Sequence, residues 1–474
     1  MPKFDERYLQ ALAGPLPEDI AARKAFGDLA GCGRLIDLRL SGKLPEALRR
    51  RLIVEKEVLQ RLPLEYPDTR EDALAKIRAA LPDFSEEEFD ALRDRGRIDW
   101  IYLDGRERYF DRAVDVLLDD PDLYRRSCFL LGQTASPEED PPLSEDTQAK
   151  RGSIRRILVT GHDIWHFETT HSLQILAENF VPGTYRVWLP IPGENGFTRN
   201  LQLLSCSGGG TAARPDAPQR TVFFERHLEA PETFSVTYAY DAVIVYRDLW
   251  TKTAEEQAWL HRNETGDARE EDTSELLPHI RFDAAMRALA AEIAGQEQNP
   301  LIRARLVYDF ITKNVKYSYV RDYASIEDLS GYAGIGLKGD CGIQALLFIT
   351  LCRSLGIPAR WQSGHGVKLH TAGSHDWACI YVAPFGWRYV DLSAGGDAFA
   401  WGDEERRRFY FGNMDCFRMA ANRDFQANFE PPCTAFRSDP YDNQDGEVEV
   451  NGEYCLVSGL GFEVTKTVRA EHRA

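Results

Sequence analysis

Residues 341–355 restrict the fold more than any other part of the chain, because they predict a helix that is apolar on nearly all sides. Asp340 suits the N-cap position, and Gly356 followed by Pro358 supplies a stop signal. The apolar residues spread around the whole predicted helix: Ile343, Leu346, Leu347, Phe348, Ile349, Leu351 and Leu355. Other layers of the protein must therefore cover this helix and leave only its N-terminal end, at Cys341, open to a cleft.

The chain has 474 residues, enough for about three domains. Two charged stretches, 134–150 and 253–275, are interpreted as linkers. The domain organisation predicted from these boundaries is a mainly helical region at 1–150, a β-sandwich-like domain at 151–252, a domain around Cys341 at 276–430, and a strand-rich C-terminal extension at 431–474. We therefore expect an α+β protein.

Local patterns support this division. The alternating runs around Asp104-Gly105 predict a hairpin in the N-terminal region, and the sequence "SEEE" at Ser85 predicts a helix start. Between 151 and 248, short alternating runs separated by Gly, Pro and Asn turns are typical of a β-sandwich.

Charge and composition exclude some classes of function. The net charge of −18 argues against nucleic acid as a partner, because phosphate binding needs a basic surface. We expect no membrane partner, since no run approaches the roughly 18 apolar residues of a spanning helix. The charged N-terminus predicts no signal peptide, and the nine cysteines form no CxxC pair. This pattern favours reduced thiols and a cytoplasmic location.

The position of Cys341 admits two interpretations. A thiol in the first turn of a helix meets the positive end of the helix dipole, which lowers its pKa and favours a reactive thiolate. The free N–H groups there also suit an oxyanion. Alternatively, Cys341 is a small buried core residue, as most cysteines are.

Two later residues favour the first interpretation. His375 lies in the strand-like run "SHDWACIYV", and Asp391 ends the next run, "GWRYVDLS". If the turn between them is centred on Phe385, both side chains point to the same side of a hairpin. A histidine oriented by a carboxylate beside a helix-terminal thiol is the Cys-His-Asp form of activated nucleophile. Symmetric pairing about Phe385 places Asp391 opposite Cys379, so its contact with His375 needs a bulge, an offset turn or strong twist.

Three segments in order, "GDCGIQALLFITLCRSLGIPAR", "HDWACIYV" and "GWRYVDLS", resemble the transglutaminase-like superfamily, which includes transglutaminases, peptide N-glycanases and many bacterial cysteine peptidases. The similarity covers about 90 residues, Arg303–Ser393. It implies a papain-like α+β core with Cys341 as nucleophile, His375 as base and Asp391 as the acid that orients it. The rest of the chain is similar to large bacterial members of this group.

The residues that would line such a site are less specific. Tyr317, Tyr319 and Gln362 are candidates for a second oxyanion donor, and Trp361 and Trp377 for walls of the acyl pocket; each also fits simple core packing. The resemblance implies no cofactor or metal, because no acidic motif matches the calcium sites of animal transglutaminases.

Other motifs are discounted. "GIGLKG" gives GxGxxG without a preceding strand, so a dinucleotide site is rejected. "HDIWH" at 162–166 has Asp163 where a zinc motif has Glu and reads as a strand, although it could form a second wall of the cleft. His365, His370 and His375 recur every five residues, but no further ligands complete a metal site.

The preferred hypothesis is a cysteine-dependent hydrolase of peptide or side-chain amide bonds that acts through a thioester. The alternatives are an acyl transferase that passes the acyl group to an amine, and a binding module with an inert domain. The expected partner is a peptide, protein or small amide substrate.

Overall fold

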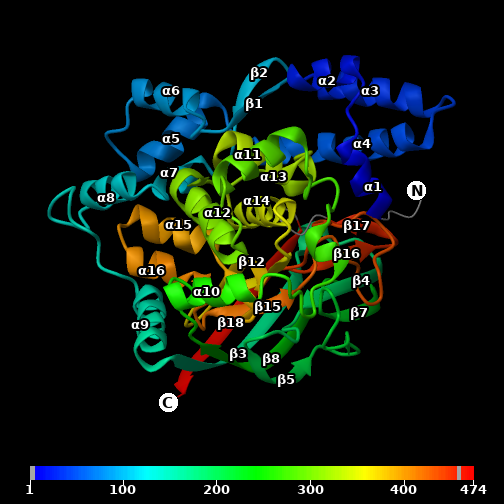
Figure 1. Ribbon diagram of the computed structural model, residues 1–474. Helices are drawn as coiled ribbons and strands as arrows, with labels where there is room; N and C mark the ends of the chain where they lie inside the picture. The colour runs from blue at the N-terminus through cyan, green and yellow to red at the C-terminus, as the bar shows by residue number, and fades with distance from the viewer. Residues whose placement is uncertain (1–5, 456–460, 474) are drawn as a thin grey trace.

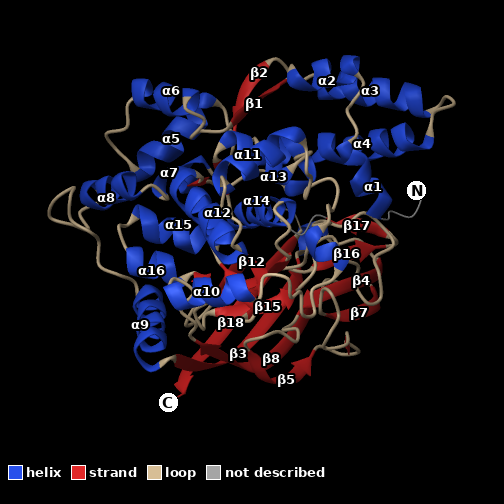
Figure 2. Cartoon of the chain, viewed as in Figure 1, coloured by secondary structure: helices blue, strands red, loops and turns tan. Residues whose placement is uncertain are grey.

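The computed structural model describes residues 6–455 and 461–473. Helices gather on one side of the molecule and long strands on the other (Figure 1, Figure 2). The architecture is α+β, as the sequence predicts. Within the described residues, no helix is both long enough and apolar enough to cross a bilayer.

Helices and one hairpin form the N-terminal region. The helices are α1 (Glu6–Gln10), η1 (Ala11–Ala13), α2 (Glu18–Ala25), α3 (Leu29–Leu40), α4 (Glu46–Glu65), α5 (Arg70–Ala80), α6 (Glu86–Asp94), α7 (Ala113–Leu118) and α8 (Pro121–Leu130). The predicted hairpin is confirmed: β1 (Trp100–Leu103) pairs with β2 (Arg106–Tyr109) across Asp104 and Gly105, whose φ angles are 50° and 72°. Ser85 caps α6 by accepting from the Glu88 N–H at 3.0 Å.

Two sheets build the β-sandwich-like region. One has the order β18-β3-β8-β5 and the other β17-β16-β4-β7-β6, and buried side chains from both form one core. Their elements are β3 (His162–Ile175), η2 (Ala177–Asn179), β4 (Gly183–Pro190), β5 (Thr198–Cys206), β6 (Thr211–Ala212), β7 (Thr221–Leu228), β8 (Thr233–Val245), β16 (Glu447–Val450), β17 (Glu453–Cys455) and β18 (Phe462–Arg473).

The C-terminal strands belong to these sheets and do not form a separate extension. Strand β18 pairs with β3 along its whole length, and β16 pairs with β4 (Figure 1). The sequence shows the alternation of these strands but not their partners, because pairing across such a distance leaves no local signal.

The predicted linkers contain helices. α9 (Glu145–Thr160) crosses the expected boundary at residue 150, and Ser144 caps it by accepting from the Thr147 N–H at 3.2 Å. α10 (Lys252–Leu260) and η3 (Glu270–Thr273) lie in the second linker. α10 forms there because Ala254 and Ala258 bury an apolar stripe in the core.

The domain around Cys341 wraps one central helix, α14 (Cys341–Ser354), as the sequence predicts. A sheet with the order β14-β13-β12-β11-β15 covers one side of it. The surrounding elements are α11 (Ala284–Ala294), α12 (Pro300–Asn314), β9 (Lys316–Tyr317), η4 (Tyr323–Ser325), α13 (Leu329–Gly336), β10 (Lys338–Gly339), β11 (Ala359–Val367), β12 (Ala372–Val382), β13 (Gly386–Val390), α15 (Leu392–Ala400), α16 (Glu404–Phe409), β14 (Phe411–Gly412) and β15 (Arg418–Asn422).

Strand β12 has two differently packed faces. Ala378 and Ile380 lie in the same core as α14, whereas Trp377 and Cys379 lie in the core of the β-sandwich-like region. Because side chains alternate along a strand, Asp376 shares the face of Ala378 and His375 shares the face of Trp377. The two neighbouring residues therefore leave β12 in opposite directions.

Candidate active site

Cys341 is the first residue of α14. The Asp340 carboxylate caps the helix and accepts from the Ile343 N–H at 3.1 Å. Residues 342–353 are buried, and Cys341 is partly exposed. The central helix thus holds its first residue at a fixed place on the surface of the core.

The His375 ring is held by Asp391. Nε2 of His375 lies 2.8 Å from Oδ2 of Asp391, which is 0% exposed. The β12–β13 ladder pairs Ala378 with Val390 and Cys379 with Tyr389, so the hairpin is centred on Pro384 and not on Phe385. Asp391 follows the last residue of β13 and caps α15, accepting from the Ala394 N–H at 3.0 Å. The chain leaves the ladder at this point, so Asp391 meets His375 diagonally. The offset turn makes this contact possible, and no bulge is needed.

A buried arginine completes this group. Arg418 Nη2 donates to Oδ2 of Asp391 at 2.9 Å, and Nη1 donates to Asp415 at 3.2 Å. Burial acts to raise the pKa of Asp391, but the His375 ring and the Arg418 guanidinium outweigh it and hold that pKa well below its usual range. Burial lowers the pKa of His375, and Asp391 opposes this shift. His375 is therefore an oriented imidazole that is neutral at physiological pH.

The thiol itself faces another group. Sγ of Cys341 donates to Oδ2 of Asp376 at 3.3 Å. Burial, followed by the charges of Asp376 and Asp340, raises the pKa of Cys341 well above its usual value. The sequence predicted the opposite shift from the helix dipole; that expectation is wrong here because desolvation and two carboxyl groups outweigh the dipole.

Among the described residues, no hydrogen bond joins Cys341 to His375. Nδ1 of His375 makes none with any described residue, while Nε2 is occupied by Asp391. The structure thus brings His375 and Asp391 together, places Cys341 beside Asp376, and leaves one ring nitrogen of His375 free.

The predicted pocket residues lie in different surroundings. Trp361 is 3% exposed and packs on Phe425 with ring centroids 5.0 Å apart, on the α14 side of the sheet. Gln362 accepts from Trp377 Nε1 at 2.8 Å, and this pair lies on the other face of β11 and β12. Trp361 can therefore wall a site at Cys341, whereas Gln362 and Trp377 hold the sheet to the β-sandwich-like region.

Of the two tyrosine candidates, Tyr317 is nearer the thiol. Tyr317 pairs with Gly339 in the short β9–β10 ladder, two residues before Cys341. Burial, followed by the Cys341 charge, raises the pKa of Tyr317 well above its usual value. Tyr319 instead packs under Arg112, whose guanidinium lies 3.5 Å from the ring centroid. Tyr317 remains a candidate for the site, and Tyr319 packs against the N-terminal region.

Three further residues reach the site without having been predicted. Tyr323 donates to Asp340, Asp376 contacts the thiol, and Gln444 donates to Asp376. Asp376 follows His375 directly, so the sequence "HDW" offered a signal for it. Gln444 lies 68 residues farther along the chain, and no sequence pattern connects it to Cys341.

Side chains of the discounted motif "HDIWH" form ion pairs with other residues of the protein. "HDIWH" lies in β3, as expected for a strand, where Asp163 pairs with Arg156 and His472, and His166 pairs with Asp241. Within the described part of the chain, no group of three or more His, Cys, Asp or Glu residues is arranged to hold a metal ion.

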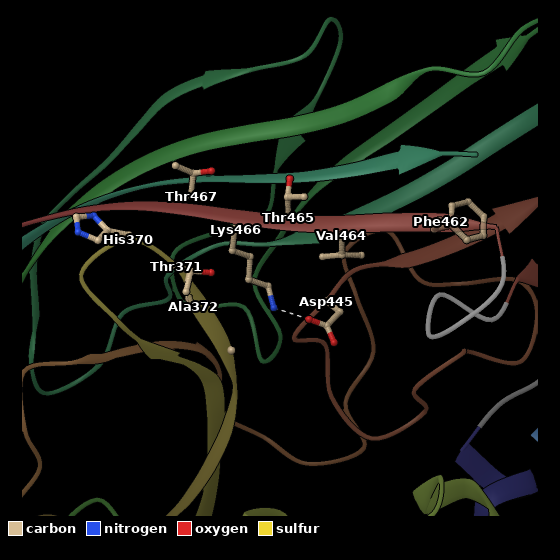
Figure 3. Close-up of a pocket in the computed structure, with 10 residues that line it drawn as sticks. His370, Thr371, Ala372, Asp445, Phe462, Val464, Thr465, Lys466 and Thr467 are labelled. Atoms are coloured by element: carbon tan, nitrogen blue, oxygen red, sulfur yellow. Dashed lines mark hydrogen bonds and ion pairs between the residues drawn. The ribbon is translucent and has the colours of Figure 1, made fainter. Parts of the chain in front are cut away.

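A pocket of about 640 Å³ opens beside the start of β12 (Figure 3). It is lined by the turn between β11 and β12, the start of β12, the C-terminal loop that precedes β16, and β18, with residues that include His370, Ala372, Asp445, Val464 and Lys466. Lys466 forms an ion pair with Asp445 across it. Asp445 directly follows Gln444, so the same short loop borders this pocket and contacts Asp376.

Comparison with known proteins identifies the central part of the chain. Residues 287–392, which contain Cys341, His375 and Asp391, match the family model of the transglutaminase-like superfamily. An uncharacterized protein of Haemophilus influenzae is 29% identical over 137 residues, which cover 24% of this chain and 37% of that protein.

Two solved structures are also similar. A candidate cysteine protease from Cytophaga hutchinsonii is 15% identical with a TM-score of 0.42, and the match covers 66% of this chain and 91% of that one. The periplasmic domain of TgpA from Pseudomonas aeruginosa is 13% identical with a TM-score of 0.26, covering 54% and 94%.

Proposed function

We propose, from the premise that residues 287–392 form a transglutaminase-like domain, that this protein is a cysteine-dependent enzyme that hydrolyses amide bonds with Cys341 as its nucleophile. The observation that carries the proposal is the hydrogen bond of 2.8 Å between Nε2 of His375 and Asp391, which orients the ring and leaves Nδ1 free. A base with one nitrogen held and the other free is what an activated thiol requires.

In this proposal Sγ of Cys341 attacks the carbonyl carbon of the amide and its proton passes to Nδ1 of His375. The carbonyl oxygen becomes an oxyanion near the first turn of α14. As the C–N bond breaks, His375 gives the proton to the leaving amine and a thioester remains. Water then attacks the thioester with His375 as base and releases the acid.

In the free protein the thiol donates to Asp376 on one face of β12 while His375 leaves the strand on the other face, so this proposal requires the two groups to approach each other past the start of β12 when substrate binds. Catalytic hydrogen bonds commonly tighten only when substrate is bound. The cysteine at a helix N-terminus is itself well placed for the reaction, since an N–H group of the first turn that Asp340 does not occupy can stabilise the oxyanion.

The test is a screen of peptides, glutamine amides and glycopeptides that follows release of ammonia, amine or new termini. The proposal predicts turnover by the natural chain and none by Cys341→Ala. Cys379→Ala, which removes a buried thiol on the other face of β12, serves as the matched control and keeps turnover. Turnover by Cys341→Ala would contradict the proposal.

The same screen separates hydrolysis from acyl transfer. A primary amine added to the reaction intercepts the thioester if the site admits an acceptor, and the product then carries the amine. For hydrolysis, the free acid remains the product at every amine concentration. An amine adduct as the main product would replace hydrolase by acyl transferase.

A further inference from the structure

Asp376 is the side chain in direct contact with the thiol. Its carboxyl packs on the first turn of α14 so closely that a Cβ added at Gly342 would lie 2.8 Å from Oδ2. The side chain is 7% exposed, and Oδ2 is the atom 3.3 Å from Sγ of Cys341. The sheet thus presents one carboxyl oxygen to the thiol, from the residue that follows His375.

The hydrogen bonds of Asp376 distinguish its two oxygens. Oδ1 accepts from Nε2 of Gln444, and the same amide nitrogen donates to Oδ2 of Asp442 at 2.9 Å. An oxygen that accepts from an amide N–H leaves the proton of a neutral carboxyl for the other oxygen. When Asp376 is protonated, its proton therefore sits on Oδ2, and it can point to Sγ once the thiol has lost the proton that it donates to this oxygen.

The surroundings favour the protonated form of Asp376. Burial is the largest cause, followed by the charge of Asp340 at the start of α14, and together with Asp439 they raise the pKa of Asp376 to about 8, although the thiol and Gln444 act in the opposite direction. Asp442 on the same C-terminal loop is also raised, to a pKa of about 7.

Other groups face this region from neighbouring elements. Tyr323 of η4 donates to Asp340, and Arg437 donates to the backbone oxygen of Asp442. Neither makes a hydrogen bond to the carboxyl of Asp376. His375, the preceding residue on β12, leaves the strand on the opposite face.

We propose that Asp376 is a further catalytic residue, a neutral acid whose Oδ2–H group donates a hydrogen bond to Sγ of Cys341 when the thiol gives its proton to His375. This inference rests on the proposed function. In the step, the S–H bond breaks, the proton moves to Nδ1 of His375, and the electron pair stays on sulfur. Asp376 keeps its own proton throughout and acts only as a donor. An ionised Asp376 would instead place a negative charge beside the thiolate and oppose the same step.

The test compares alkylation of Cys341 by iodoacetamide in the natural chain, Asp376→Asn and Asp376→Ala from pH 6 to 10, read by peptide mapping, with Cys341→Ala identifying the label. In the Asn variant the amide oxygen can accept from Gln444 while the NH₂ group donates to Sγ at every pH. The ratio of the natural rate to the Asn rate removes the effects of burial and of Asp340 on the thiol, which both proteins share, and keeps the effect of the Asp376 carboxyl.

We expect this ratio to be near one at neutral pH and to fall about tenfold above the pKa of Asp376, since a hydrogen bond to a charged group is worth that factor or more. Asp376→Ala should react about tenfold more slowly than Asn at all pH values. A ratio that stays constant from pH 6 to 10, or an Ala variant as fast as the natural chain at pH 7, would overturn the inference.

The outcome is independent of the amide screen. If the alkylation ratio falls with pH but no amide is cleaved, the inference holds for the thiol and the proposed function fails. If amides are cleaved through Cys341 and the ratio stays flat, the proposed function holds and Asp376 is only a packing residue. Thermal unfolding of the variants at pH 7 identifies any that does not fold.

Discussion

The two faces of β12 hold carboxyl groups in opposite states. On one face Asp391 lies between His375 and Arg418, and its pKa falls well below its usual range despite complete burial. On the other face Asp376 lies beside Cys341 and among acids, and its pKa rises to about 8. Burial acts in the same direction on both, so the difference comes from the partners: a cation stabilises the carboxylate, and an acidic neighbour stabilises the neutral acid.

This contrast assigns different tasks to adjacent residues. A charged Asp391 can orient an imidazole and stabilise the imidazolium that forms during proton transfer. A neutral Asp376 can donate a hydrogen bond, which a carboxylate cannot do. The strand β12 therefore separates His375 and Asp391, which are suited to taking up a proton, from Asp376, which is suited to stabilising a negative charge on the sulfur of Cys341.

The largest effect is expected from removing the cation on the His375 face. Arg418→Ala leaves Asp391 and Asp415 buried without their shared partner, and breaking such a pair costs about 3–5 kcal/mol of unfolding free energy. Urea unfolding measures the change. Arg423 directly follows the strand that Arg418 begins, and its side chain is exposed. Arg423→Ala is therefore the matched control and should change stability by less than about 0.5 kcal/mol. Equal effects of the two variants would show that Arg418 does not hold the face together.

The next effect concerns the orientation of His375. Asp391→Asn keeps the shape of the side chain but removes the charge that holds Nε2, so kcat/KM for an amide substrate should fall by about 10²–10⁴-fold. Asp397→Asn on α15, an exposed acid paired with Arg406, is the control and should leave the rate unchanged. A fall of similar size in both variants would point to general damage to α15.

The smallest expected effect is a pH dependence of the unfolding free energy that has opposite signs for Asp376 and Asp391. A carboxyl whose pKa is raised in the folded state stabilises the protein at low pH, and this contribution is lost as pH rises through the folded pKa, about 8 for Asp376. The natural chain should therefore lose stability between pH 5 and 8, by up to about 1.4 kcal/mol per pH unit for each such group.

Asp376→Asn removes one of these groups and should make the decline shallower in urea unfolding at several pH values. Asp442, with a pKa of about 7, and Glu447, with a pKa of about 8, still contribute to the remaining slope. Asp391 has the opposite sign, because its lowered pKa gives stability that is lost only in strong acid. Identical pH slopes for the natural chain and Asp376→Asn would contradict a protonated Asp376.

Local sequence patterns anticipated the parts of the site that depend on neighbours in the chain. The cap at Asp340, the length of α14 and the shared parity of His375 and Asp391 follow from residues within a few positions of each other. The hairpin register could not be predicted in this way, since the turn is centred on Pro384, one residue earlier than expected. Moving the centre of the turn by one residue shifts the pairing by two residues, so His375 and Asp391 stay on the same face. Only the position along β12 at which Asp391 leaves the ladder changes.

The remaining features depend on long-range contacts. Gln444 reaches Asp376 only because β16 joins the sheet of β4 and carries its loop past the site. The raised pKa of Cys341 depends on burial and on Asp376, neither of which the helix dipole argument includes. Sequence reasoning located the nucleophile candidate and missed the acid that touches it.

The most direct measurement of the central claim is the mass of the acyl-enzyme. Substrate from the amide screen is mixed with the protein, quenched in acid within the turnover time, and the intact chain and its peptides are weighed. The account predicts a chain heavier by the acyl group, with the adduct on the peptide that contains Cys341 and absent from Cys341→Ala. An acyl group on another residue, or turnover that continues in Cys341→Ala, would contradict it.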